Sequence, residues 1–254
     1  MTDAATKMDD TKTTAKIQQQ EGESTTTTAL STEELKALTD GLRKWMGFES
    51  CGEKDDARDW DKVREVLRLH KNHLDAISRF KTDSGKSPIH WVAMKEAPLD
   101  VVELFLQGWP EGVKEKDNSG TIPLTYAIWK KSTTAVVLAL LEAYPEGAKE
   151  KSDATKLALH YAVENQASLE VVNALLSANP EGVKEKNKDG CLPLHFAVAN
   201  QASLEVVNVL LSAFPEGVKE KEEDGGGLPL HYSVASQASL EVVNALLSAN
   251  PEGV

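Results

Sequence analysis

The chain has 254 residues, of which 41% are hydrophobic and 27% charged, and its formal net charge is −12 at pH 7. Such an acidic balance disfavours binding to nucleic acid or to an anionic membrane surface, because both require a basic footprint. No run approaches the roughly 18 apolar residues of a membrane-spanning helix, and residues 1–20 lack the apolar core of a signal peptide, so we expect no membrane insertion.

Residues 1–30 are rich in Thr, Gln and Lys, and residues 25–28 are consecutive threonines. A segment of this composition cannot bury enough apolar surface to offset the entropy lost on ordering. We therefore expect a disordered tail over residues 1–30.

Two helices are expected between residues 31 and 80. Ser31 and Glu34 have the spacing of a helix capping box. An apolar stripe typical of an amphipathic helix follows, made of Leu35, Leu38, Leu42, Trp45 and Met46. Asp59 is a suitable N-cap for the second helix, which aligns with residues 203–211 of a segment that recurs later in the chain. Because a stack of repeats must hide its first apolar face, we expect residues 31–80 to form a divergent N-terminal capping unit.

From residue 81 onward the sequence repeats itself. The triplet Pro-Glu-Gly recurs at steps of 35, 35, 35 and 36 residues, beginning at Pro110, Pro145, Pro180, Pro215 and Pro251. A second motif keeps the same period and defines copies 1 to 5: Pro88-Ile89-His90, Pro123-Leu124-Thr125, Ala158-Leu159-His160, Pro193-Leu194-His195 and Pro229-Leu230-His231. A period of this length indicates stacked supersecondary units that bury a continuous core between neighbours.

Copy 4 shows how the unit is expected to fold. Pro193 suits the first position of a helix, where its missing N–H would be unpaired anyway, and this first helix should run for about eight residues. Ser203 can cap a second helix, whose expected buried stripe is Leu204, Val207, Leu210 and Leu211. Pro215 should end that helix, Gly217 should let the chain turn, and an extended segment over residues 218–222 should lead to the next turn.

This unit resembles the ankyrin repeat, whose pattern reads Gly-x-Thr-Pro-Leu-His-x-Ala and continues through a helix hairpin to an extended finger loop. The likeness covers residues 57–254 and implies an all-α solenoid of stacked helix-turn-helix units with finger loops. Compared with the usual period of about 33 residues, each copy has one extra residue between the helices and another at the Pro-Glu-Gly corner. The threonine of the pattern is replaced by Ser87, Ile122, Leu157, Leu192 and Leu228.

Two parts of the repeat array are expected to be unusual. Copy 3 has Thr155 in place of the turn glycine and Ala158 in place of the proline, so we expect it to be the least regular. The sequence stops at Val254, just after a second helix like its predecessors, so residues 81–254 should hold about five repeats with an uncapped C-terminal end. Either further repeats follow in a longer protein or a partner covers this end, and a monomer is expected unless the open end pairs.

Four histidines occupy one position of the repeat and are the most obvious candidate metal ligands: His90, His160, His195 and His231. Packed helices lie about 8–10 Å apart, whereas each ligand of a zinc ion must lie about 2 Å from it. Neighbouring histidines therefore cannot share a metal, and the ankyrin resemblance implies that each one hydrogen-bonds the adjoining turn. His70 and His73 have i, i+3 spacing but no third ligand.

No motif of a catalytic site is present in the sequence: no Gly-x-Ser-x-Gly, no phosphate-binding glycine loop, no His-Glu-x-x-His and no Cys-x-x-Cys. Cys51 and Cys191 lie in unlike contexts, which indicates free thiols in a reducing compartment. The Lys-Glu-Lys runs after each corner indicate a solvated segment with ion pairs between copies. We therefore expect an intracellular, cytoplasmic protein that is not an enzyme and uses no metal or cofactor.

In the family that the chain resembles, partners bind the concave side, formed by the finger-turn tips and the ends of the first helices. At these positions copies 1 and 2 carry large and basic residues where copies 4 and 5 carry mostly small ones. The expected protein-binding residues are Lys86, Met94, Lys95, Asn118, Thr121, Trp129, Lys130 and Lys156. Trp129 and Met94 flanked by lysines suit an acidic, amphipathic peptide of a protein partner, unless Trp129 packs inward between neighbouring helix ends.

The leading hypothesis is thus a non-enzymatic protein-interaction module that acts as a scaffold or adaptor. The alternative is that these repeats target or regulate a larger enzyme, for example a kinase or a ubiquitin-ligase component, whose catalytic domain lies beyond Val254. A metal-binding or nucleic-acid-binding role gains no support from the spacing or the charge.

Overall fold

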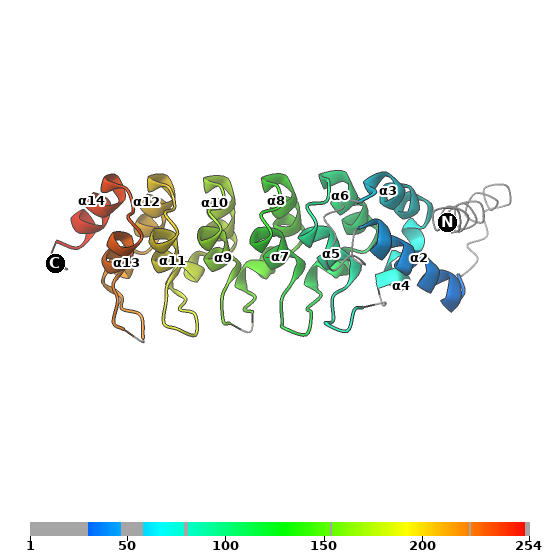
Figure 1. The fold of residues 1–254 in the computed structure, drawn as a ribbon, viewed down its shortest axis with the longest axis horizontal. Coiled ribbons are helices and arrows are strands. Elements are labelled where there is room, and N and C mark those ends of the chain that lie inside the picture. The colour runs from blue at the N-terminus through cyan, green and yellow to red at the C-terminus, as the bar shows by residue number, and fades with distance from the viewer. Residues whose placement is uncertain (1–29, 47–57, 79–80, 153, 224, 252–254) are drawn as a thin grey trace, which may run out of the picture. The chain divides into compact units, whose positions relative to one another are not determined.

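Helices make up all the regular secondary structure in the computed structural model, which describes residues 30–46, 58–78, 81–152, 154–223 and 225–251 (Figure 1). Contacts divide the chain into two compact units, Met1–Ser31 and Thr32–Val254, and the helices described below belong to the second. The tail expected over residues 1–30 lies outside the described residues except for Leu30, and so does Cys51.

Each copy of the repeat forms a pair of helices, the first of seven residues and the second of ten. The pairs are α5 (Pro88–Met94) with α6 (Leu99–Gly108), α7 (Pro123–Trp129) with α8 (Thr134–Ala143), α9 (Ala158–Glu164) with α10 (Leu169–Ala178), α11 (Pro193–Ala199) with α12 (Leu204–Ala213), and α13 (Pro229–Ala235) with α14 (Leu240–Ala249). The pairs are preceded by α2 (Thr32–Trp45), α3 (Trp60–Leu69), the 3₁₀ helix η1 (Lys71–His73) and α4 (Leu74–Ser78).

The pairs stack in sequence order. First helices contact first helices from α5 through α13, and second helices contact second helices from α6 through α14. Figure 1 shows the second helices in one row, the first helices in another, and the finger loops all projecting on the same side. Within residues 32–254 this is the all-α solenoid that the repeat predicts.

Local sequence accounts for the helix boundaries. Pro193 is the first residue of α11, and the Ser203 side chain accepts a hydrogen bond from the Val206 amide at the start of α12. The apolar stripe of α12 differs from the prediction, because Val206 is buried with Val207 and Leu210 while the predicted Leu204 and Leu211 are only half-buried. These two leucines therefore lie on the edges of the buried face.

The Pro-Glu-Gly corner also differs from the extended segment expected after Pro215. Residues Pro215–Lys219 form the 3₁₀ helix η5, and the chain becomes extended only at Glu220. The same short helix recurs as η2 (Pro110–Lys114), η3 (Pro145–Lys149) and η4 (Pro180–Lys184). Gly217 is needed for space rather than for backbone freedom, since a Cβ atom there would lie 2.9 Å from the Phe214 ring.

Copy 3 is regular, contrary to expectation. Its helix α9 has the same length as the first helices of the other copies, although it begins with Ala158 instead of proline. Thr155 takes the left-handed conformation (φ 55°) that Gly120 and Gly190 adopt in the neighbouring copies. The Thr155 amide still donates to the Ser152 carbonyl at 2.7 Å, so the turn closes as it does with glycine.

The helices that precede copy 1 pack on its outer side. Helix α2 contacts α5 and α3 contacts α6, and the Arg43 guanidinium lies over the buried Trp91 ring at 5.0 Å. Asp59 caps α3 as predicted, accepting from the Lys62 amide at 3.0 Å. The assignment of residues 31–80 as a separate capping unit stays a prediction.

At the other end of the described chain, the last helix pair has apolar side chains at its surface. Val234 is 65% exposed and Leu240 is 70% exposed, whereas Val198, the equivalent of Val234 in copy 4, is 0% exposed. Val198 is covered within the stack, where α11 contacts α13, whereas Leu169, the equivalent of Leu240 in copy 3, is itself 36% exposed. None of the described helices combines the length and the apolar character that crossing a membrane requires.

Candidate interaction surface

The recurring histidines are part of the frame that carries the finger loops. His90 Nδ1 accepts from the Ser87 amide at 3.2 Å, and His90 Nε2 lies 3.1 Å from the Thr121 carbonyl in the finger of the next copy. His195 Nδ1 accepts from the Leu192 amide at 3.1 Å, and its Nε2 lies 3.3 Å from the carbonyl of Gly227, the equivalent of Thr121, and 3.1 Å from the Glu220 carbonyl. His90 and His195 therefore tie the start of their own helix to the finger of the next copy, as expected.

Burial keeps the imidazoles of His90 and His160 neutral. It lowers the pKa of His90 and of His160 to about 4, because a charged ring would lose its hydration in the interior. In the part of the chain that the structure describes, no three His, Cys, Asp or Glu side chains come together as metal ligands would.

The predicted binding residues lie on the finger turns and at the ends of the first helices in copies 1 to 3, but they are not equally accessible. Asn118, Trp129 and Lys130 are exposed, whereas Met94, Lys95, Lys86 and Lys156 are half-buried and Thr121 is only 8% exposed. The Thr121 side chain therefore does not reach a partner without rearrangement of the turn.

Trp129 is the large aromatic side chain at this surface. It occupies the last position of α7, and the residue is 48% exposed. The indole stacks on the Tyr126 ring, with 5.8 Å between ring centroids and an interplanar angle of 27°, and Lys130 Nζ lies 4.5 Å from the indole centroid. The alternative in which Trp129 packs inward between neighbouring helix ends is therefore not the observed one.

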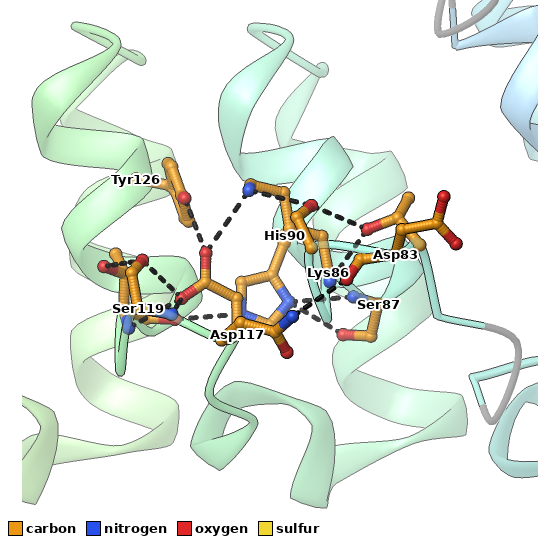
Figure 2. Close-up of polar contacts among 11 residues, drawn as sticks. Asp83, Lys86, Ser87, His90, Asp117, Ser119 and Tyr126 are labelled. Carbon is orange, nitrogen blue, oxygen red and sulfur yellow. Dashed lines mark hydrogen bonds and ion pairs between the residues drawn. The ribbon is translucent and has the colours of Figure 1, made fainter.

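A buried carboxylate, Asp117, lies at the base of the copy 2 finger and bonds Tyr126, on which Trp129 stacks (Figure 2). Its Oδ1 accepts from the Ser119 and Thr121 amides, each at 2.9 Å, and its Oδ2 accepts from the Tyr126 hydroxyl at 2.7 Å. Burial by itself would raise the pKa of Asp117, but these hydrogen bonds outweigh it and lower the pKa to about 2. The carboxylate is therefore ionised at neutral pH.

Lys86 belongs to the same network, whereas the sequence predicted that it faces a partner. Its Nζ lies 3.3 Å from Asp117 Oδ2 and 5.4 Å from the centroid of the Tyr126 ring. The Lys86 side chain is only 17% exposed and that of Asp117 only 1%. The ammonium is thus engaged by a buried carboxylate of the same chain.

Lys156 is engaged in a similar way one copy further along. Its Nζ pairs with a Glu164 carboxylate oxygen at 2.9 Å and lies 4.3 Å from the centroid of the Phe196 ring. Asn118 is bonded to the finger of copy 1, where its Nδ2 donates to the Asp83 carbonyl at 2.8 Å. Lys130, by contrast, places its ammonium over the Trp129 indole.

The finger edges carry the ion pairs between copies that the Lys-Glu-Lys runs predict. Lysines and glutamates of successive copies pair as Lys81–Glu115, Lys116–Glu150, Lys151–Glu185 and Lys186–Glu220. Because each of these finger lysines faces a carboxylate, the finger edges contribute little unbalanced positive charge. Positive charge is instead added at the first-helix ends by Lys130 and Lys131, which are both exposed.

Asp117 and Tyr126 were not singled out from the sequence. Their positions hold Ser152 with Tyr161 in copy 3 and Asn187 with Phe196 in copy 4. Only copy 2 combines an acid at the turn, a tyrosine on the first helix and a tryptophan at the end of that helix. This combination is visible in the sequence once the copies are aligned, but its importance depends on the burial of the carboxylate.

Comparison with known proteins gives one match at the level of a family. Residues 159–253 match a model of ankyrin repeats, in three copies. No curated protein sequence matches the chain.

The fold recurs widely among solved structures, 370 chains of which match. One is a chain of the structure of the predatory endopeptidase Bd0816 from Bdellovibrio bacteriovorus in complex with the immunity protein Bd3460. The match has a TM-score of 0.56 and 18% sequence identity, and covers 73% of this chain and 96% of that chain. At this identity the likeness concerns the fold alone.

Proposed function

We propose that this chain, whose residues 159–253 are ankyrin repeats, is a protein-binding module that holds an acidic, apolar segment of a partner against Trp129. The repeats imply a protein–protein interaction module. The place on the surface and the chemistry of the partner are our proposal, and the exposed, rigidly backed indole of Trp129 is the observation that carries it.

Trp129 has the properties of a binding anchor. Tryptophan is enriched among the residues that dominate binding energy, because it buries a large area and has few rotatable bonds to order. Here the indole is 48% exposed, yet its orientation is already restricted by the stack on Tyr126. A partner would therefore gain apolar contact at a small entropic cost.

The charges around the indole favour an acidic partner. Lys130 lies over the ring and Lys131 is exposed next to it, whereas the nearby acids Asp117 and Glu164 are already paired with Lys86 and Lys156. A partner carboxylate placed near Lys130 would pair with an ammonium that otherwise only touches the indole face. The whole chain has a net charge of −12, so this basic surface is a local exception. It would select an acidic partner and steer it to Trp129.

We propose no catalytic role for the chain. The buried titratable side chains of the described helices and fingers, such as His90 and Asp117, are used in hydrogen bonds that hold the turns. A scaffold or adaptor requires this rigidity, since its task is to present an unchanging surface.

A selection from random sequences tests the proposal while the partner is unidentified. Phage-displayed random peptides would be selected on the wild-type chain and compared with selections on Trp129→Ala and Lys130→Asn. Both variants suit the fold, because alanine occupies the Trp129 position in copies 4 and 5 (Ala199, Ala235) and asparagine the Lys130 position in copies 3 and 4 (Asn165, Asn200).

Peptides selected on the wild type should combine Asp or Glu with large apolar residues, lose binding to Trp129→Ala, and bind Lys130→Asn more weakly as a function of salt. Lys219→Asn, a lysine of a corner on another part of the molecule, serves as the charge control and should bind like the wild type. Selected peptides that bind Trp129→Ala unchanged, or that show no preference for acidic residues, would refute the proposal.

A further inference from the structure

The exposed Trp129 ring rests on a tyrosine that is held from several sides. The Tyr126 hydroxyl donates to Asp117 Oδ2 at 2.7 Å, and its ring meets the edge of the His90 ring at 5.9 Å between centroids. Lys86 Nζ lies 5.4 Å from the ring centroid. Tyr126 itself is only 4% exposed. Since the indole stacks on this ring, whatever fixes Tyr126 also fixes the plane of Trp129.

Asp117 is in turn fixed by its own turn. Besides the Tyr126 hydroxyl it receives hydrogen bonds from the Ser119 amide and hydroxyl and from the Thr121 amide, and Lys86 compensates its charge (Figure 2). A buried carboxylate with this many donors has one favourable position. The result is a rigid connection from Lys86 in the finger of copy 1, through Asp117 and Tyr126, to the surface tryptophan of copy 2.

We infer that Lys86 and Asp117 are positioning residues for the Trp129 anchor, acting through Tyr126 and not by contact with the partner. This inference rests on the proposed function, but the order that it assigns to the Trp129 ring is a property of the free chain. Lys86 therefore acts within the fold, whereas Lys130 contacts the partner, although one lysine lies near the Tyr126 ring and the other near the Trp129 ring.

The chain supplies its own matched substitutions for this test. Asn187 in copy 4 accepts from the Asp189 amide at 3.1 Å and the Cys191 amide at 2.8 Å, as Asp117 does in its turn, so Asp117→Asn keeps the turn bonds and removes the charge. Phe196 occupies the tyrosine position of copy 4, so Tyr126→Phe removes only the hydroxyl at a position that accepts phenylalanine. Tyr161→Phe in copy 3 is the control, because no tryptophan stacks on that tyrosine: Glu164 stands at the Trp129 position.

The first measurement is made on the free chain labelled with 5-fluorotryptophan. Its five tryptophans should give separate ¹⁹F signals, and the signal missing from Trp129→Phe belongs to Trp129. In Asp117→Asn and in Tyr126→Phe this signal should change its relaxation towards that of a mobile ring, and a soluble paramagnetic agent should reach it more easily. Tyr161→Phe should leave it unchanged, and circular dichroism should be the same for all variants. An unaltered Trp129 signal in both network variants would overturn the inference, whatever the binding results are.

The second measurement uses a peptide selected on the wild-type chain. If Trp129 must be ordered on binding, the dissociation constant should rise about two- to tenfold in Asp117→Asn and Tyr126→Phe, which is the usual cost of immobilising one side chain. For Asp117→Asn the direction of the change in the dissociation constant is informative. Removing a negative charge near a basic surface would by electrostatics alone tighten the binding of an acidic peptide. Tighter or unchanged binding in this variant would count against positioning.

The anchor and its positioning network can be tested separately. If Trp129→Ala does not weaken the peptide, the proposed function is wrong, and the ¹⁹F signal still decides whether the network orders the ring. If Trp129→Ala weakens the peptide but Asp117→Asn and Tyr126→Phe do not, the anchor stands and the positioning role is wrong. Lys86→Met should resemble Asp117→Asn in the ¹⁹F experiment and, unlike Lys130→Asn, should leave the salt dependence of peptide binding close to that of the wild type.

Discussion

Leu192 packs on Gly217: a Cβ atom added to the glycine would lie 3.4 Å from Leu192 Cδ1. Leu192 stands where the ankyrin pattern has threonine, and Gly217 belongs to the corner at which that pattern is one residue shorter. Likewise, a Cβ atom added to Gly147 would lie 3.0 Å from Ile122 Cδ1, and one added to Gly182 would lie 3.3 Å from Leu157 Cδ1. In copy 1 the hydroxyl is kept instead, and Ser87 Oγ lies 2.8 Å from His90 Nδ1. The apolar residue at the threonine position and the longer Pro-Glu-Gly corner are therefore parts of one apolar contact. This contact replaces the capping hydroxyl.

Leu192→Thr should consequently destabilise the chain although it restores the threonine of the ankyrin pattern. The variant loses the apolar contact with the corner, and the hydroxyl recovered near His195 does not make up for it, so unfolding in urea should show a loss of about 1–3 kcal/mol. Ser87→Thr, at the copy that has kept its hydroxyl, is the matched control and should change little. A gain in stability for Leu192→Thr would show that the corner contact is not what leucine provides.

The corner glycines should differ in how well they tolerate a methyl group. A Cβ atom at Gly112 would lie 2.4 Å from the Trp109 ring, which is 9% exposed, whereas a Cβ atom at Gly182 would meet the Asn179 amide at 2.8 Å. A packed indole cannot move aside as a short polar side chain can, so Gly112→Ala should cost about 1–3 kcal/mol and Gly182→Ala less. Equal melting temperatures for the two variants would argue against this ranking.

Stability should fall with acidity in the window set by the buried histidines. The pKa of His90 and His160 is lowered by burial from 6.5 to about 4, so the unfolded chain binds more protons than the folded chain between these values. The contribution of neutral histidine is therefore complete above pH 6.5 and is lost as the pH falls to about 4, on the order of 3 kcal/mol for each ring.

Urea unfolding between pH 8 and pH 4 would measure this dependence. His160→Thr is the informative variant, because Thr125 fills the same position in copy 2. It should be less stable at pH 7 and should show a shallower decline on acidification than the wild type. A decline as steep as that of the wild type would assign the acid sensitivity to other groups.

Lysine-to-methionine substitutions should separate surface ion pairs from the buried one. Lys151 and Glu185 pair at 2.8 Å, but their side chains are 47% and 43% exposed. Lys151→Met should therefore change the free energy of unfolding by less than about 0.5 kcal/mol. Lys86→Met leaves the buried Asp117 without its cation and should cost about 1 kcal/mol or more. Similar effects of the two substitutions in the same buffer would contradict the difference in burial.

Much of the fold follows from the sequence because its determinants are local. The period, the proline at the start of each first helix and the Ser203 type of cap act within a few residues, and each helix pair begins where they place it. The bonding of His195 to the adjoining turn is what the ankyrin resemblance implies. Because the same local signals recur at the same spacing, successive helix pairs have the same shape and pack on one another in the same way. The all-α solenoid was therefore predictable.

What depends on the neighbouring copy could not be read from one repeat. The short helix at Pro215–Lys219, the burial of Val206 and the regular turn at Thr155 all differ from what the repeat pattern predicts. The same holds for the candidate site, in which Trp129 proved exposed while Lys86 and Thr121 are engaged within the fold. Lys86, Thr121 and Lys156 occupy one position of the repeat, and each is at least half-buried. The contacts across two copies decide which side chains face solvent. The sequence by itself therefore determined the repeating frame, and the tertiary structure decided which of its unlike residues are left to meet a partner, because burial is a property of neighbours and not of the repeat.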